Sequence, residues 1–279
     1  GLRFNDVPPA VREAACLHLT DAIGVGLAAS VGAGPRGWSG AMNSRGGIAT
    51  CLSGGQAAPN EAAMLNGALI HALEYDDTHT GSVIHGSAVA APVALAVAEA
   101  ENASGADLLL NYVIAWEVMS RIGLAAPGAF QVRGFQVTAI AGAIGAAAAA
   151  ARQCGLAADG IVQAIGIAGS QASGLLTFLE DGSSVKALNP GWAAQTGIMA
   201  ASFAASGMTG PSGILDGPLG VMRVFAGEVG HLLEQTATLG QTWHLPDAAY
   251  KLYPCCHYIH PFLEATEQLM ARGLRAEQV

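Results

Sequence analysis

A charge-free run of mostly alanine and glycine, from Val137 to Ala151, is the strongest constraint on the fold of this chain. A second apolar run of the same kind covers residues 88–98. Small side chains allow helices to approach one another closely, so both runs predict buried helices in a tightly packed bundle. Each run falls short of the roughly 20 apolar residues that a membrane span needs. We therefore expect a bundle that does not enter a membrane.

Apolar residues recur at helical spacing along most of the chain, for example at Leu110, Val113 and Val118. Strand signals are nearly absent, apart from a short extended piece at residues 48–52. The sequence therefore predicts a mainly α fold, with a large all-helical domain over residues 1–240. The expected helices cover residues 10–30, 60–74, 86–102, 107–124, 135–152, 158–173 and 191–206.

The pattern changes near residue 240. Short extended segments are expected at residues 242–245 and 249–253, followed by a helix over residues 261–272. The sequence stops soon after that helix, before another element completes a second core. We predict that residues 241–279 are the beginning of a second domain.

Charge and cysteine content narrow the classes of function. Apolar residues make up 52% of the chain and charged residues 12%, so we expect part of the surface to be covered in a subunit interface. The net charge of −9 and the absence of a basic cluster argue against nucleic-acid binding. Five scattered cysteines and an N-terminus without a signal-peptide pattern predict a reducing, cytoplasmic location.

The densest polar cluster lies between His71 and His85, in a chain that is otherwise poor in charge. Glu74 shares a helix face with His71, and the residues after it favour a loop. Convergent carboxylates and imidazoles at helix ends suit general acid–base chemistry. The alternative is that they only cap helices, which is common for one such residue but costly for a whole set in an apolar chain. The set is His71, Glu74, Asp76, Asp77, His79 and His85.

Two lysines occur in the chain, Lys186 and Lys251. Lys186 lies in a segment that favours a loop before a helix at residue 191, and Lys251 lies near two cysteines and two histidines. A compact ammonium group is a good partner for a carboxylate, so both lysines are candidate binders of an anionic substrate. The alternative is a pair of solvated surface lysines in a chain that uses arginine more often.

Metal and nucleotide binding find no recognised pattern in the sequence. The glycine-rich residues 32–37 lack both common phosphate-binding motifs. Two sets of metal ligands can be imagined, but neither has a recognised zinc spacing. We expect no metal and no cofactor. The two sets are His71-x-x-Glu74 with His79 and His85, and Cys255-Cys256-His257-x-x-His260.

At these residues the sequence resembles the MmgE/PrpD family, which includes 2-methylcitrate dehydratase, cis-aconitate decarboxylase and iminodisuccinate epimerase. The resemblance runs through nearly the whole chain, and residues 180–197 most resemble the MmgE-type branch. Five blocks in the family's order carry it: Asp21–Gly26, Asn66–His79, Gly166–Gly174, Lys186–Ala194 and Lys251–Pro261.

The resemblance implies a large all-helical domain and a smaller α/β lid, with the active site between them. It also implies a homodimer and no metal or organic cofactor. Residue by residue, the resemblance places the family's active-site acid on Glu74, with Asp77 and Thr78 beside it. It places the following histidine on His85 and the two substrate-binding lysines on Lys186 and Lys251.

The chain departs from the family pattern in three ways. Gln136 stands where some members have a histidine, so it can hydrogen-bond the substrate but cannot act as an acid or base. Cys256 stands where decarboxylase-type members have a histidine, and His257 follows one place later. Most of the lid is absent from the sequence. Asn189, Tyr253 and Cys256 complete the residues expected to contact the substrate.

These expectations lead to a cofactor-independent lyase that removes water from a small 2-hydroxy tricarboxylate such as 2-methylcitrate. Glu74, Asp77 and His85 are expected to carry the proton traffic with help from His257, while the lysines hold the carboxylates. Decarboxylation or epimerisation of a related acid is the second hypothesis, and Gln136 weakens its decarboxylase version. A non-catalytic helical scaffold that lacks its lid is the third.

Overall fold

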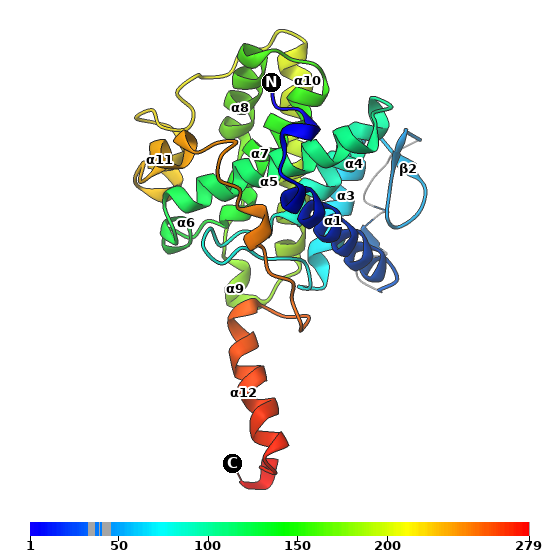
Figure 1. The fold of residues 1–279 in the computed structure, drawn as a ribbon, viewed down its shortest axis with the longest axis vertical. Coiled ribbons are helices and arrows are strands. Elements are labelled where there is room, and N and C mark those ends of the chain that lie inside the picture. The colour runs from blue at the N-terminus through cyan, green and yellow to red at the C-terminus, as the bar shows by residue number, and fades with distance from the viewer. Residues whose placement is uncertain (33–36, 39, 41–45, 279) are drawn as a thin grey trace.

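Helices make up most of the chain, as the apolar spacing predicts (Figure 1). The computed structural model describes residues 1–32, 37–38, 40 and 46–278. The long helices are α1 (Pro9–Ser30), α3 (Pro59–Ala72), α4 (Ser87–Ala100), α5 (Gly105–Ala125), α7 (Val137–Gln153), α8 (Ala158–Gln171), α10 (Val185–Ala205) and α12 (His260–Ala271). The short elements are η1 (Phe4–Asp6), β1 (Ala49–Thr50), β2 (Gln56–Ala57), α6 (Ala129–Val132), α9 (Phe178–Asp181), η3 (Met222–Ala226), α11 (Leu232–Ala237), η4 (Leu245–Asp247), η5 (His257–Ile259) and η6 (Ala276–Gln278).

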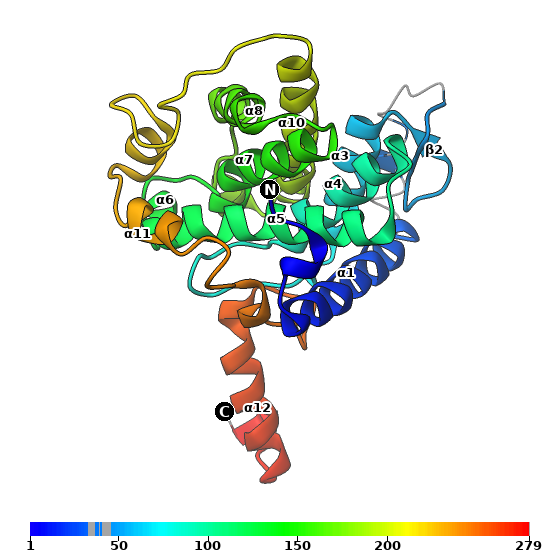
Figure 2. The same ribbon diagram turned by 45° about the horizontal axis from the view of Figure 1, so that its top comes forward.

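The alanine-rich run forms helix α7, which lies at the centre of the bundle between α5, α8 and α10 (Figures 1 and 2). Every side chain of α7 from Val137 to Ala151 is buried. Glycine permits the closest contact with α5, since a β-carbon on Gly145 would lie only 2.6 Å from the Ala115 carbonyl oxygen. The small residues therefore bring the helix axes close together, and the predicted all-helical body is confirmed.

Helices α3 and α10 cross at a second glycine contact. A β-carbon on Gly191 would lie 2.0 Å from the Met64 carbonyl oxygen, and one on Gly67 would lie 2.7 Å from the Gly191 α-carbon. The crossing lies a few residues before the end of α3 and a few residues after the start of α10. It therefore places the residues that follow α3 beside the first turn of α10, which is where Glu74 and Lys186 meet.

Helix α10 begins at Val185, six residues earlier than the expected start at residue 191. The predicted loop around Lys186 is therefore wrong. The expectation followed the sequence Asn189-Pro190-Gly191, because proline and glycine usually interrupt helices. Pro190 lies inside the helix, and the packing of Gly191 against α3 favours the helical path at that point. The other predicted helices begin and end within a few residues of the observed ones.

The segment after residue 240 does not form the predicted strands. Residues 245–247 form η4, and the one pairing recorded there is an isolated antiparallel bridge between Thr78 and Ala249. A side chain takes the place of a strand partner, because Glu117 accepts the backbone N–H groups of His244 and Leu245 at 2.7 and 2.9 Å. The expected extended segment at 242–245 is therefore wrong, because a 3₁₀ turn begins at Leu245, and in the segment at 249–253 Ala249 alone pairs, with Thr78.

The C-terminal helix α12 projects away from the bundle (Figures 1 and 2). None of its residues is buried. Leu245 and Lys251 are both buried, whereas no residue of α12 is, and the domain boundary near residue 240 stays a prediction.

Helix α5 is the one helix among the described residues that is long and apolar enough to cross a bilayer. Of its most apolar 18-residue window, 72% is buried inside the bundle. Core helices of large bundles meet the same criteria of length and composition.

Candidate active site

The end of helix α3 presents Glu74 in an unusual backbone conformation. Leu73 is the C-cap of the helix and Glu74 follows it with φ of +53°. This left-handed position after a helix is usually taken by glycine, since a β-carbon makes it less favourable. A carboxylate here turns away from the helix axis. The Glu74 backbone carbonyl also turns, and it accepts a hydrogen bond from Lys251 Nζ at 2.8 Å.

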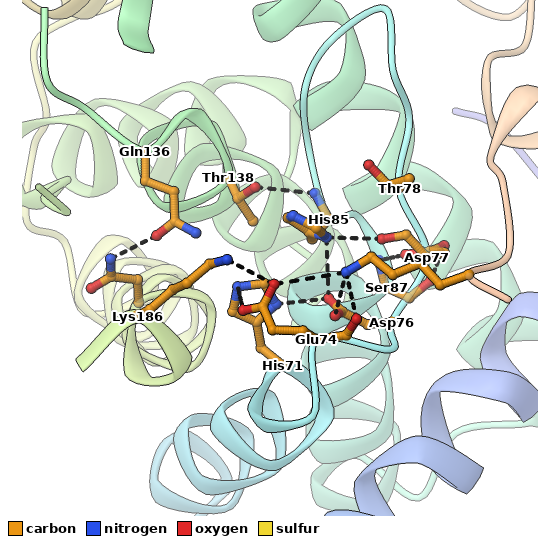
Figure 3. A network of polar contacts seen from close by, with 12 residues as sticks. His71, Glu74, Asp76, Asp77, Thr78, His85, Ser87, Gln136, Thr138 and Lys186 are labelled. Carbon is orange, nitrogen blue, oxygen red and sulfur yellow. Dashed lines mark hydrogen bonds and ion pairs between the residues drawn. The ribbon is translucent and has the colours of Figure 1, made fainter. Parts of the chain in front are cut away.

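The two lysines of the chain converge on Glu74 from distant segments, and Figure 3 shows Lys186 beside Glu74. Lys186 Nζ, from the first turn of α10, donates to Glu74 Oε2 at 2.7 Å. Lys251 Nζ lies 3.8 Å from the same oxygen and 3.9 Å from Asp76 Oδ1. The Lys186 and Glu74 side chains are 24% and 25% exposed, whereas that of Lys251 is 1% exposed. The structure therefore brings together three of the predicted residues, with one ammonium group at the surface of the site and one beneath it.

A buried carboxylate–imidazole pair lies behind Glu74. The Asp76 carboxylate accepts a hydrogen bond from His71 Nδ1 at 2.8 Å, and neither side chain is exposed. The other ring nitrogen of His71, Nε2, is buried without a hydrogen-bond partner among the described residues and lies 4.0 Å from Glu74 Oε1. Asp76 thus orients the imidazole so that its second nitrogen faces the Glu74 carboxylate, which is an arrangement suited to proton transfer.

His85 completes this buried group. Its ring lies edge-on to that of His71, with the ring centres 4.7 Å apart. His85 Nδ1 lies 3.1 Å from the Asp77 carbonyl oxygen and 3.5 Å from Asp76 Oδ2. The backbone N–H of His85 donates to the Thr138 hydroxyl at 3.0 Å, which ties it to the start of α7.

Burial and neighbouring charges decide the protonation of these groups. Burial lowers the pKa of His85 to about 4, an effect that Asp76 only partly opposes, so the ring is neutral at pH 7. Burial by itself raises the pKa of Asp76, but His71, His85 and Lys251 outweigh it and hold that pKa far below its usual value. The pKa of Glu74 is likewise lowered, because His71, Lys186 and Lys251 outweigh burial. At neutral pH the site therefore holds two carboxylates and a neutral base.

Asp77 lies on the other side of the loop from its neighbour Asp76. Its Oδ1 accepts the backbone N–H of Ser87 at 3.0 Å and its Oδ2 accepts the Ser87 hydroxyl at 2.5 Å, so it caps the start of α4. Oδ2 also lies 3.3 Å from His18 Nδ1 on α1. Adjacent residues in an extended loop point in opposite directions, and the structure therefore places Asp76 rather than Asp77 with Lys251 and Glu74.

Thr78 and the residues after Lys251 form the edge of the site. Thr78 pairs with Ala249 through backbone hydrogen bonds of 3.0 and 2.8 Å, which fixes the segment that carries Lys251. The Thr78 hydroxyl lies 3.4 Å from His257 Nδ1. Burial, together with the positive charge of Lys251, lowers the pKa of His257. Both residues thus lie near the segment that carries Lys251.

Gln136 and Asn189 form an amide pair across the site, whereas Tyr253 lies elsewhere. Asn189 Nδ2 donates to Gln136 Oε1 at 2.6 Å. Gln136 immediately precedes α7 and is labelled in Figure 3. The Tyr253 hydroxyl donates to Glu267 of α12 at 2.7 Å. The structure therefore places Gln136 and Asn189 together and directs the Tyr253 hydroxyl toward the projecting helix.

A cavity of about 660 Å³ opens in front of Glu74 and Lys186. The N-terminal turn of α10 and the residues before it form one wall, with Gly182, Ser183 and Ser184. Unpaired backbone N–H groups and the helix dipole favour an anion at such a turn. His71 and Cys256 also line the cavity. It therefore combines an anion-binding wall with the acid–base groups described above.

The group His71, Asp76 and His85 also has the spacing of a metal site, since one ligand atom from each lies within 4.8 Å of the others. Lys251 places a positive charge 3.9 Å from Asp76, which opposes binding of a second cation. The carboxylate oxygen nearest to His71 is already hydrogen-bonded to that ring. The charges here fit proton transfer better than metal binding.

Sequence reasoning gave too little weight to His71 and Asp76. The motif around His71-Ala72-Leu73-Glu74 offers no means of telling which of two adjacent aspartates faces the imidazole. One signal was present: His71 and Glu74 lie three residues apart at the end of a predicted helix, so a histidine beside the acid could be expected.

The chain is similar to a known family and to several curated proteins. A family model described as the MmgE/PrpD N-terminal domain matches residues 1–231. A cis-aconitate decarboxylase of Aspergillus terreus is 33% identical over 226 residues, which cover 77% of this chain and 46% of that protein. A cis-aconitate decarboxylase-like protein of Aspergillus oryzae is 33% identical over 225 residues, covering 76% of this chain and 46% of that protein.

A human cis-aconitate decarboxylase is 32% identical over 201 residues, which cover 70% of this chain and 41% of that protein. The chain thus spans less than half the length of the curated relatives it matches. The match of the family model to most of the chain, on a helical body of the expected kind, shows that this protein belongs to the MmgE/PrpD family.

Proposed function

We propose that this chain forms the catalytic body of a lyase that acts on a small polycarboxylate, and that the reaction is loss of CO2 from an unsaturated tricarboxylate such as cis-aconitate. The observation that carries the proposal is the convergence of Lys186, Lys251 and Glu74 at the cavity, with the Asp76–His71 pair behind them. The three relatives named above are cis-aconitate decarboxylases or resemble one, which supports this choice of reaction.

Substrate carboxylates are expected to bind where positive charge meets the cavity. Lys186 and the N-terminal turn of α10 supply one subsite, because an ammonium group and the positive end of the helix dipole lie on the same wall. A substrate carboxylate competes with Glu74 for Lys186, since the two are already paired at 2.7 Å. Binding therefore frees the Glu74 carboxylate to face the substrate.

In the proposed reaction the carbon–carbon bond to one carboxylate breaks and CO2 leaves. The electron pair is delocalised onto the remaining unsaturated carboxylate until a carbon atom takes up a proton. Lys251 stabilises the negative charge that builds up, because its ammonium group is fixed and buried beside the site. The proton comes from the imidazolium form of His71, whose Nε2–H passes it to the carbon atom directly or through Glu74, and the ring then regains a proton from solvent. Asp76 stabilises that imidazolium before the transfer.

Dehydration of a 2-hydroxy tricarboxylate such as 2-methylcitrate is the second candidate. The observation that favours it is the amide pair of Gln136 and Asn189. Gln136 stands where some family members are expected to have a histidine, and its amide group is neither an acid nor a base. The same Glu74 and His71 groups serve this reaction, one removing a proton next to a carboxylate and the other protonating the departing hydroxyl.

Mass analysis of the products distinguishes these reactions. The natural full-length protein is incubated with cis-aconitate and, separately, with 2-methylcitrate. Decarboxylation removes CO2, dehydration removes water, and epimerisation leaves the mass unchanged. If neither substrate is turned over, and citrate does not raise the melting temperature, the chain is a non-catalytic scaffold and the proposal is wrong.

Assembly is a separate proposal. Apolar side chains lie exposed along one side of α10, namely Leu188, Trp192, Met199 and Phe203. We propose that this side packs against a second copy of the chain, which agrees with the low charge content of the sequence. Light scattering gives the mass of the assembly, and the variant Trp192→Glu is expected to shift it toward the monomer. The cytoplasmic location stays a prediction from the sequence.

A further inference from the structure

A second cavity, the apolar cavity, has a volume of about 400 Å³ and adjoins the active-site cavity in front of Glu74 and Lys186. Trp38 and Ser184 line both cavities. Among the lining residues that the structure describes, none of those in the apolar cavity carries a charge. Its other walls come from α3 and α10, with Met64, Leu65, Ala68, Val185, Leu188 and Trp192.

The order of residues along the two helices explains why the cavities adjoin. On α3, Ala68 lines the apolar cavity, and Ala72, about one turn later on the same face, lines the active-site cavity. On α10, Val185 lines the apolar cavity and its neighbour Lys186 lines the active-site cavity. One helical turn is about 5.4 Å long. A ligand held by Lys186 therefore has the apolar cavity within about one turn of its carboxylate.

The chemistry of the two cavities fits a ligand with several carboxylates and an apolar chain. Lys186 Nζ and Lys251 Nζ lie 2.7 and 3.8 Å from the same Glu74 oxygen, so two ammonium groups are available for the anionic part. A fatty acid has only one carboxylate for these two groups, and an unsubstituted tricarboxylate has no chain for the apolar walls. A tricarboxylate with an alkyl substituent satisfies both cavities.

We propose that the apolar cavity is a subsite for an alkyl substituent, so that the preferred substrate is a tricarboxylate that carries a chain of several carbon atoms. This inference rests on the proposed function, because it requires Lys186 to bind a substrate carboxylate. The subsite selects the substrate and contacts no reacting atom. Its contribution comes from the burial of methylene groups, which is favourable for each group removed from water.

A second copy of the chain is the competing occupant of the apolar cavity. Leu188 and Trp192 line this cavity and also belong to the exposed side of α10 that we propose as the assembly surface. Continuity with the active-site cavity favours the alkyl chain, because Trp38 and Ser184 line both cavities. Affinity and assembly are therefore measured on the same variants.

Binding of a series of citrates to the natural full-length protein tests the proposal. Isothermal titration with citrate, 2-methylcitrate and 2-butylcitrate measures the effect of chain length without turnover. We expect the affinity to rise about fourfold for each fully buried methylene group, and by about tenfold or more from the methyl to the butyl compound. Equal affinity for 2-methylcitrate and 2-butylcitrate overturns the proposal.

Leu188→Gln makes one wall of the apolar cavity polar. The Leu188 side chain is 38% exposed, so this variant is expected to fold normally. The ratio of the 2-butylcitrate affinity to the 2-methylcitrate affinity is expected to fall by about threefold or more. If the ratio is unchanged and light scattering shows a shift toward the monomer, the cavity belongs to the interface between copies and the proposal is wrong.

The matched control is Met199→Gln. Met199 is also 38% exposed and lies on the same side of α10, but it does not line the apolar cavity. The affinity ratio of this variant is expected to stay within about twofold of that of the parent protein. An equal fall of the ratio in the two variants would contradict a subsite at Leu188.

Turnover separates this inference from the proposed function. If cis-aconitate loses CO2 but 2-butylcitrate binds no better than 2-methylcitrate, the subsite is wrong and the reaction stands. If the affinity rises with chain length but neither cis-aconitate nor any of the citrates is turned over, the reaction is wrong and the subsite stands. If none of the three citrates binds, both are wrong.

Discussion

Two carboxylate–cation pairs of this protein contain similar groups in different surroundings. Glu117 and Arg121 lie on α5, and both are buried. Glu117 accepts the backbone N–H groups of His244 and Leu245. Arg121 donates to the carbonyl oxygens of Gln235 and Thr242 at 2.7 and 2.6 Å. The hydrogen bonds of this pair bind the segment at residues 235–245 to the bundle.

Glu74 and Lys186 come instead from two helix ends that meet at the glycine crossing of α3 and α10. Their shared hydrogen bond faces the cavity, and each side chain remains about one quarter exposed. A ligand carboxylate can therefore take the place of Glu74 and bind the Lys186 ammonium group. A charged pair is structural when backbone groups occupy its hydrogen-bonding atoms. The pair is available for chemistry when it faces a cavity that a ligand can enter.

The largest expected effect is loss of stability in Glu117→Ala. This change leaves Arg121 buried without its carboxylate and leaves two backbone N–H groups without an acceptor. We expect the free energy of unfolding to fall by about 3–5 kcal/mol in urea denaturation. Glu117→Gln keeps an acceptor for the N–H groups, so its loss is expected to be smaller. Equal losses in the two variants would contradict the role given to those hydrogen bonds.

The next largest effect is on activity, in Lys186→Met. Removing a charge that binds and stabilises the substrate is expected to lower kcat/KM by about 100-fold or more. The free energy of unfolding should change by less than about 1 kcal/mol, because partly exposed ion pairs contribute little. Steady-state kinetics and urea denaturation of the full-length protein measure the two effects.

Arg152→Met is the matched control for that variant. Arg152 Nη2 lies 3.5 Å from Asp107 Oδ1, and the two side chains are 27% and 46% exposed. This pair lies outside the cavity, so activity is expected to stay within twofold of wild type. A similar loss of kcat/KM in both variants would remove the distinction between the two kinds of pair.

A smaller effect is expected in the pH dependence of stability. The folded-state pKa of His85 is about 4, below the usual 6.5, so the unfolded chain binds a proton more readily than the folded one between these values. Stability is therefore lost as the pH falls through this window, by about 2 kcal/mol between pH 7 and pH 5 for this group. His85→Gln should remove that part of the loss, as measured by urea denaturation at the two pH values.

The exposed His231 gives the control for the pH effect. His231→Gln is expected to keep the wild-type difference in unfolding free energy between pH 7 and pH 5. If His85→Gln also keeps that difference, His85 is not a buried neutral base in the folded protein.

The smallest effect is expected in Tyr253→Phe. The structure pairs this hydroxyl with Glu267 on α12, outside the buried cluster. Loss of an exposed hydrogen bond should change the free energy of unfolding by less than about 0.5 kcal/mol and leave KM within about twofold. A tenfold rise in KM would instead support the sequence-based prediction that Tyr253 binds the substrate.

Much of the fold follows from the sequence because it depends on local patterns. The alanine-rich run predicts the buried helix α7, and the resemblance to a known family places Glu74, Lys186 and Lys251 in one site. Helix α10 was predicted less well, since Pro190 and Gly191 indicate a break where packing against α3 keeps the helix continuous. Local propensity is a weak guide where tertiary contacts oppose it.

The sequence by itself determined the class of fold and the group of residues from which the site is built. The tertiary structure decided which members of that group face one another. Asp76 and Asp77 are adjacent and chemically identical, yet the first is paired with His71 and the second caps α4. The physical reason is that the residue type fixes the charge and the hydrogen-bonding groups of a side chain, whereas the direction in which the side chain points decides which partner it contacts. That direction is set by contacts between segments far apart in the sequence.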